Sequence, residues 1–160
     1  MIDARADRWG AALLLAVTLG LLAAWPVWRL TDLAPADAYA QTPENFAQSM
    51  EVYVAVHQVG ERDGMPLIRP QPGADIPVIA RRFEFWPALE LKAGQSYRLH
   101  VTSLDTVHTV VVHGQEFSLI PGQVRVIQLA PAKPGMLILQ CGEYCGLGHN
   151  RMRGSAEVVD

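Results

Sequence analysis

The hydrophobic pattern begins with a long apolar run near the N-terminus. Trp9 to Trp28 is an uncharged run of 20 residues, rich in Leu, Ala and Val, between Arg8 and Arg29. A helix rises about 1.5 Å per residue, so this run spans the roughly 30 Å hydrocarbon core of a bilayer. Tryptophan residues lie at both ends of the run, and tryptophan rings prefer the membrane interface. The run therefore predicts a transmembrane anchor within residues 1–30.

A cleaved signal peptide is the alternative, because Ala38-Tyr39-Ala40 offers a small-x-small cleavage site. The apolar run is longer than the ~7–15 residues of a signal core, and this site lies far beyond it, which favours the anchor. Arg5 and Arg8 precede the run, whereas only Arg29 follows closely. The positive-inside rule therefore predicts a cytoplasmic N-terminus and a C-terminal domain on the outer face.

After a predicted linker over residues 31–50, in which Pro43 offers the start of a short helix, the pattern changes to alternation. Val52, Val54 and Val56 alternate with other residues, and the segment 97–102 alternates apolar and polar positions. Apolar runs at 124–129 and 136–140 are separated from their neighbours by turn signals at 92–94, 121–122 and 133–135. Short strands at this spacing predict a mainly β sandwich or barrel over residues 51–160.

The formal net charge is −3, of which residues 1–30 contribute +1 and the remainder −4. An acidic balance outside the anchor disfavours nucleic acid as a partner and permits a basic protein partner.

The chemistry gathers in Cys141-Gly-Glu-Tyr-Cys145-Gly-Leu-Gly-His149-Asn-Arg-Met152, which holds both cysteines of the chain. Two thiolates, an imidazole and a thioether form a soft ligand set that suits copper. Three alternatives remain. A disulfide would leave His149 and Met152 unexplained, and structural zinc, with His108 completing the set, has no use for a thioether. A thioredoxin-like dithiol needs βαβ units, which the pattern lacks.

A mononuclear blue-copper site uses one cysteine, two histidines and a distant methionine. Here a second cysteine lies in the same loop, and two such thiolates can bridge two metal ions with one histidine on each. The second histidine must come from elsewhere in the chain, and the candidates are His57, His100, His108 and His113.

The spacing Cys-x-Glu-x-Cys-x-x-x-His-x-x-Met resembles the binuclear copper A loop of subunit II of haem-copper cytochrome c oxidases. Thr102-Ser-Leu-Asp-Thr-Val-His108 resembles the family segment that ends in the other histidine ligand. The resemblance covers roughly residues 77–159 and implies a cupredoxin-like Greek-key β-sandwich. The single predicted N-terminal helix resembles the small subunit II of ba3-like oxidases. The sequence has no Cys-x-x-Cys-His motif, so a fused haem c is not expected.

The resemblance implies a role for each matching residue. Cys141 and Cys145 would bridge two copper ions, and His108 and His149 would each bind one of them. Met152 would be a weak thioether ligand, and Glu143 would bind through its backbone carbonyl. In many family members this Glu also reaches a magnesium ion at the border with subunit I, so Glu143 is a candidate for that contact.

Other residues take weaker assignments. Phe83, Phe85 and Trp86 occupy the place of the family's aromatic cluster, where electrons arrive, with ordinary core packing as the alternative. His113 lies five positions after His108, so on a strand it would point to the opposite face. It is expected, with His57 and His100, to be a surface or hydrogen-bonded histidine rather than a ligand.

The resemblance implies a single-pass subunit in a bacterial or archaeal-type cell membrane. It would accept electrons from cytochrome c or a small copper protein and pass them to haem in subunit I, where oxygen is reduced and protons are pumped. A free-standing, membrane-tethered copper carrier or storage module would show the same ligands. The terminal domain of a nitrous oxide reductase shares the copper loop, but the predicted anchor and the absence of a large catalytic domain in this sequence argue against it. A quinol oxidase subunit II is excluded because it lacks the copper ligands.

Overall fold

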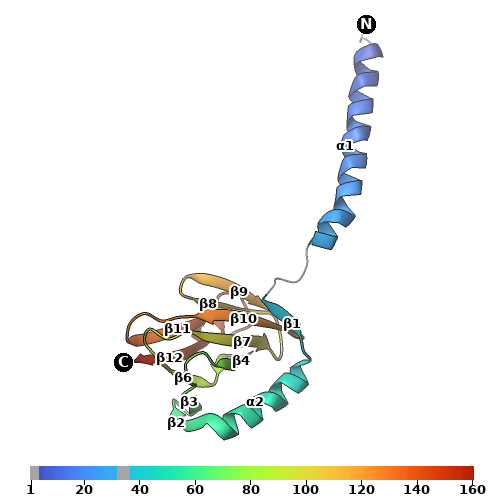
Figure 1. Cartoon of the computed structure of the whole chain (residues 1–160). Helices are drawn as coiled ribbons and strands as arrows, with labels where there is room; N and C mark the ends of the chain where they lie inside the picture. Colours follow the sequence, from blue (N-terminus) through green and yellow to red (C-terminus); the bar gives the residue numbers. More distant parts are fainter. Residues whose placement is uncertain (1–3, 32–36) are drawn as a thin grey trace. The chain divides into compact units, whose positions relative to one another are not determined.

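A computed structural model describes the backbone of residues 4–31 and 37–160, and the side chains of residues 9–24 and 37–160. The chain divides into two compact units, Met1–Ala36 and Asp37–Asp160 (Figure 1).

The first unit contains helix α1 (Ala4–Thr31), which covers the apolar run. The side chains of residues 9–24 are all exposed. Across the described part of the chain, no helix combines the length and apolar character needed to cross a membrane. The side chains of Arg8, Trp25, Trp28 and Arg29, which delimit the expected anchor, lie outside the described residues. The anchor therefore stays a prediction.

The second unit is mainly β, as expected, with one long helix. Its described elements, in chain order, are β1 (Ala38–Ala40), α2 (Pro43–His57), β2 (Gln58–Arg62), β3 (Met65–Ile68), β4 (Asp75–Arg81), β5 (Glu84–Trp86), β6 (Ala88–Lys92), β7 (Tyr97–Ser103), β8 (His108–Val112), β9 (Gln115–Leu119), β10 (Gln123–Leu129), β11 (Gly135–Cys141), the 3-10 turn η1 (His149–Arg151) and β12 (Arg153–Val159).

The strands make one continuous, curled sheet rather than two separate hydrogen-bonded sheets. The main path runs β1-β10-β7-β4-β5-β12-β11-β8-β9, and β6, β3 and β2 extend it from β12. Strand β5 joins the two halves because it pairs with β4 on one side and β12 on the other. Figure 1 shows the resulting layers of strands, with α2 running along them. Three expected strands, at 97–102, 124–129 and 136–140, are confirmed as β7, β10 and β11.

Helix α2 corrects the prediction for residues 51–56. Thr42 caps the helix by accepting a hydrogen bond from the Asn45 N–H, and Pro43 follows in the first turn, where its missing N–H costs nothing. Phe46, Met50 and Val54 recur every fourth position, and all three are buried. This helical spacing outweighs the alternation of valines at 52, 54 and 56, so the expected strand is wrong. Residues 37–50 belong to the compact unit rather than to a linker.

The sheet brings two distant segments together at one end. Strands β8 and β11 are antiparallel neighbours, with Cys141 opposite Val110. The N–H of Gly142 donates to the Thr109 carbonyl at 3.0 Å, and the N–H of Cys141 donates to the Met152 carbonyl at 3.2 Å. The start of β8, the end of β11 and the start of β12 therefore form one rigid frame around the 141–152 loop.

Candidate metal centre

His108 is the first residue of β8 and is completely buried. Its Nε2 atom lies 2.8 Å from Oδ1 of Asp105, and its Nδ1 atom lies 3.7 Å from Sγ of Cys141. An imidazole that donates its Nε2–H to a carboxylate keeps a lone pair on Nδ1, which can bind a metal ion. The ring is therefore oriented with its metal-binding nitrogen toward the cysteines.

Asp105 is itself held in place. Burial opposes its ionisation, but hydrogen bonds from His108 and from the N–H groups of Arg82 and Thr106 outweigh that effect and lower the pKa of this carboxyl group. The ionised carboxylate is the form that accepts a hydrogen bond from the His108 ring.

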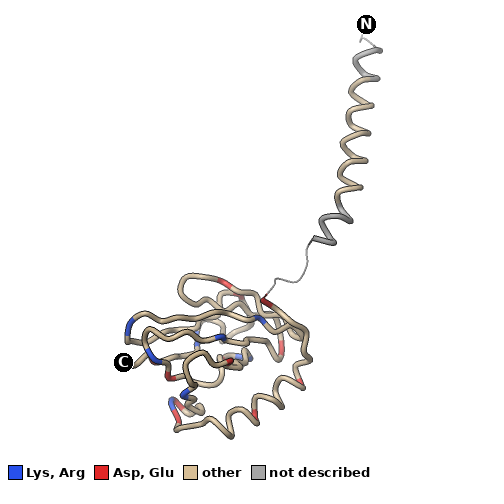
Figure 2. Tube along the Cα trace, viewed as in Figure 1, with Lys and Arg blue, Asp and Glu red and all other residues tan. Residues whose placement is uncertain are grey.

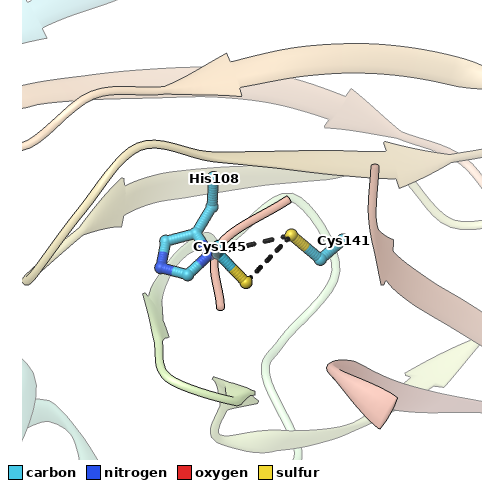
Figure 3. Close-up of side chains that lie close together, drawn as sticks. All are labelled: His108, Cys141 and Cys145. Carbon is cyan, nitrogen blue, oxygen red and sulfur yellow. Dashed lines mark hydrogen bonds between the residues drawn. The ribbon is translucent and has the colours of Figure 1, made fainter. Parts of the chain in front are cut away.

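The cysteines supply the centre of the cluster. Cys141 ends β11, Cys145 lies in the loop that follows, and their sulfur atoms are 3.8 Å apart. Both are free thiols, because a disulfide needs an S–S distance of about 2.05 Å. His108, Cys141 and Cys145 form a buried group whose ligand atoms lie within 4.8 Å of one another (Figure 3). A separation of 3.8 Å lets one ion contact both sulfurs at the roughly 2.3 Å of metal–thiolate bonds.

The remaining donors come from the segment before β12. The turn η1 places Nδ1 of His149 3.9 Å from Sγ of Cys145, and Sδ of Met152 lies 3.5 Å from the same sulfur. The carbonyl oxygen of Glu143 lies 3.2 Å from Sγ of Cys141. Met152 is completely buried, whereas the side chain of Glu143 is exposed. The four other residues expected as ligands thus lie beside the two cysteine sulfurs.

The thiols are kept away from water. Burial, followed by the contact with Cys141, raises the pKa of the Cys145 thiol to about 11. A thiol with this pKa stays protonated at neutral pH unless a metal ion displaces the proton. This donor set, with two soft sulfurs, a thioether and two imidazoles, fits copper better than zinc.

The three expected aromatic residues have different environments. Phe85 is 1% exposed and belongs to the core, and Trp86 is partly buried under the guanidinium of Arg81. Phe83 is 37% exposed, and its ring lies against the loop glycines Gly146 and Gly148. Phe83 therefore contacts the 141–152 loop from the protein surface, whereas Phe85 shares the buried core with Cys141, Cys145 and Met152.

The other three histidines lie away from the cluster. His57 ends α2 and is exposed, which places it on a helix rather than on the expected strand. His113 is also exposed, but it sits in the turn after β8 with a φ of 50°, so the expectation that a strand turns it to the opposite face is wrong. His100 is hydrogen bonded to Tyr39 and Asp75.

Two residues of the site had no assigned role in the sequence analysis. Asp105 orients His108, and its position three residues before a candidate histidine is a usable signal. Arg82 donates from Nε to the carbonyl oxygen of Cys145 at 2.9 Å. No motif indicates this contact, because it joins residues 63 positions apart.

Comparisons with known proteins extend this picture. Residues 80–159 match the cytochrome c oxidase subunit II periplasmic domain family. Cytochrome c oxidase subunit 2 of Thermus thermophilus is 32% identical over 86 residues, which cover 52% of this chain and 64% of that protein. The chain spans less than two thirds of the length of this relative and of others it matches.

Solved structures agree with the fold. A chain of a heme-copper terminal oxidase dimer, seen by cryo-electron microscopy, matches at 26% identity and a TM-score of 0.51, over 96% of this chain and 99% of its own length. Reduced rusticyanin matches with a TM-score of 0.54 over 76% of this chain and 99% of that chain, at 13% identity, which shows that the fold is cupredoxin-like. The family match covers half of the chain and includes all six residues of the cluster, and the chain therefore belongs to the cytochrome c oxidase subunit II family.

Proposed function

We propose that the chain is the electron-transfer subunit of a haem-copper oxidase and holds a binuclear copper A centre. The observation that carries this proposal is the symmetry of the donors around two sulfurs. Sγ of Cys141 faces Nδ1 of His108 at 3.7 Å, and Sγ of Cys145 faces Nδ1 of His149 at 3.9 Å. In this assignment the cysteines bridge two ions, and each histidine binds one.

The weaker donors are divided between the two sides. The Glu143 carbonyl lies beside Cys141, and the Met152 thioether lies beside Cys145. When bound, a copper pair supplies a one-electron carrier whose charge is shared between two ions. The chain keeps that carrier rigid and dry, since His108 and Met152 are fully buried and strand ends fix the loop. A rigid site changes little in geometry when an electron arrives, which favours fast transfer.

The surface around the loop suits contact with a protein partner. Tyr144, between the two cysteines in the sequence, is 69% exposed, and Leu147, between Cys145 and His149, is 95% exposed. Exposed apolar side chains at such a place favour docking of an electron donor, which we assign to cytochrome c or a small copper protein. Subunit I, which carries haem, is the proposed acceptor, and the exposed carboxylate of Glu143 is a candidate magnesium ligand at that border.

The proposed anchor, with the N-terminus in the cytoplasm and the copper domain on the outer face, gains support from β1. Ala38–Ala40, the small-x-small site of the signal-peptide alternative, pairs with β10 in the sheet. Cleavage after Ala40 would remove this strand and the hydrogen bond from Tyr39 to His100. Retaining the segment keeps the edge of the sheet covered, which is consistent with a mature chain that still carries its N-terminal helix.

The test has two parts. The full chain, purified in mild detergent and loaded with copper, is expected to bind two ions and to give the electron paramagnetic resonance spectrum of one electron shared by two coppers. One copper per chain would overturn the proposed centre. Isolation of the tagged chain from gently solubilised membranes is expected to bring down a haem-bearing polytopic subunit. A copper-loaded chain that emerges without haem would favour the free-standing carrier instead.

A further inference from the structure

The turn between β4 and β5 contacts both halves of the metal centre through one residue. The Nε–H of Arg82 donates to the carbonyl oxygen of Cys145 at 2.9 Å. The backbone N–H of the same residue donates to Oδ2 of Asp105, also at 2.9 Å. Asp105 uses its other oxygen to hold His108. Arg82 therefore links the cysteine loop to the carboxylate that orients the buried histidine.

The neighbouring residue strengthens this contact. The ring of Phe83 packs against Gly146 and Gly148, on either side of the exposed Leu147. The loop after Cys145 is thus held from one side by a hydrogen bond and by an aromatic ring, both from the 82–83 turn. Within the loop itself, the N–H of His149 donates to the Gly146 carbonyl and the N–H of Arg151 donates to the Gly148 carbonyl, so the 82–83 turn adds restraints from outside the loop.

The guanidinium group also brings a permanent positive charge. Arginine stays protonated at all relevant pH values, and its planar fork holds a fixed direction once it is hydrogen bonded. A fixed cation beside a redox centre stabilises the state that carries the extra electron. Arg82 is an exposed residue, so solvent screens part of this effect, but its Nε–H contacts the carbonyl of a buried cysteine. In Figure 2, basic and acidic residues are spread over the compact unit, so the effect of Arg82 rests on its contact rather than on a general field.

We propose that Arg82 is a positioning residue that holds the Cys145 loop against the His108–Asp105 pair and raises the reduction potential of the bound copper. This inference rests on the proposed copper centre. Contacts outside the direct ligands typically change metal affinity by roughly 10–100-fold when they are removed. Arg82 is expected to fall at the lower end of this range, because it touches a backbone carbonyl and not a ligand side chain.

The test compares three variants of the full chain. Arg82→Met removes the hydrogen bond and the charge, and Arg82→Lys keeps the charge without the planar fork. Arg81→Met is the matched control, since Arg81 is the adjacent arginine and its guanidinium pairs with Glu84. The measurements are the midpoint potential of the copper-loaded chain, the rate of copper release to a chelator, and amide hydrogen exchange of residues 142–152 in the metal-free chain.

For Arg82→Met we expect a lower potential, copper release about tenfold faster and faster exchange in the loop. Arg82→Lys should have a midpoint potential close to that of the wild type but faster hydrogen exchange in the loop. Arg81→Met should match the wild type in all three measurements. The inference is overturned if Arg82→Met and Arg81→Met behave alike in all three measurements. A wild-type chain that fails to form the two-copper centre contradicts the proposed function. The exchange data from the metal-free chain then still decide whether Arg82 holds the loop.

Discussion

Oδ1 of Asp105 lies 2.8 Å from Nε2 of His108, while Nδ1 of the same ring faces the sulfur of Cys141. One carboxylate thus fixes both the tautomer and the direction of a fully buried imidazole. The histidine presents Nδ1 to the cysteines from a strand end, and the carboxylate that orients it comes from the preceding loop.

Asp105→Asn should therefore weaken copper binding without unfolding the chain. An amide cannot accept hydrogen bonds at both of its positions, so one of the contacts with His108 and Arg82 is lost. We expect copper affinity to fall by roughly 10-fold or more, measured by competition with a chelator. Asp75→Asn, which alters the other aspartate–histidine pair, is the control. Equal losses in the two variants would contradict the role of Asp105.

The ligands should separate into two classes on mutation. Cys141→Ser or Cys145→Ser is expected to abolish the two-copper spectrum, because each removes a thiolate of the proposed bridge. Met152→Leu should keep both ions and shift the reduction potential, since a thioether is a weak ligand and leucine fills a similar volume. Metal analysis and electron paramagnetic resonance distinguish these outcomes. Complete loss of copper from Met152→Leu would show that the thioether is essential.

Gly148→Ala should disturb the loop by collision. A Cβ atom at this position would lie 2.8 Å from Cε2 of Phe83, closer than the ring can tolerate. We expect a lower melting temperature and reduced copper stoichiometry. In the double variant Gly148→Ala/Phe83→Ala, removal of the ring should restore part of both, which a double-mutant cycle measures. Gly60→Ala is the control, because no atom lies near its added Cβ.

The helical assignment of α2 makes a prediction about stability. Met50 is fully buried and Val52 is 62% exposed. Met50→Ala should cost about 2–5 kcal/mol of unfolding free energy, whereas Val52→Ala should change it by less than about 0.5 kcal/mol. Thermal or denaturant unfolding, followed by the circular dichroism of the sheet, compares them. Similar costs at the two positions would favour a strand over a helix.

The ion pairs of Asp75 predict how the stability of the fold depends on pH. Hydrogen bonds from Arg98 and then from His100 hold the pKa of Asp75 well below its usual range. Because the folded-state pKa is lower than the unfolded value of about 3.9, the ionised carboxylate stabilises the fold above that value. Its side chain is 54% exposed, so solvent limits the gain to about 1 kcal/mol or less. The stability difference between the wild type and Asp75→Asn should be full at pH 7 and narrow below about pH 4. A difference that grows on acidification would contradict this sign.

The sequence was most informative where a pattern is local. Alternation and turn glycines located β7, β10 and β11. The cysteine motif named Glu143, His149 and Met152, and the resemblance of the 102–108 segment named His108, and all four lie beside the two sulfurs. The failures have physical causes. Three valines in α2 alternate by coincidence, while its Thr42 cap and the four-residue spacing of Phe46, Met50 and Val54 decide for a helix. Arg82 was missed because its hydrogen bond depends on how β4 and β5 approach the loop, and only the tertiary fold determines that.

The separation of His108 from the cysteines along the chain has a consequence for maturation. His108 and Cys141 are 33 positions apart, and the strands β9 and β10 lie between them. An ion bound to both would close this loop in the manner of a covalent cross-link, which for such a length restricts the unfolded chain by about 4 kcal/mol. Bound copper would therefore also stabilise the folded sheet, and a copper-loaded chain would resist unfolding and proteolysis better than a metal-free one.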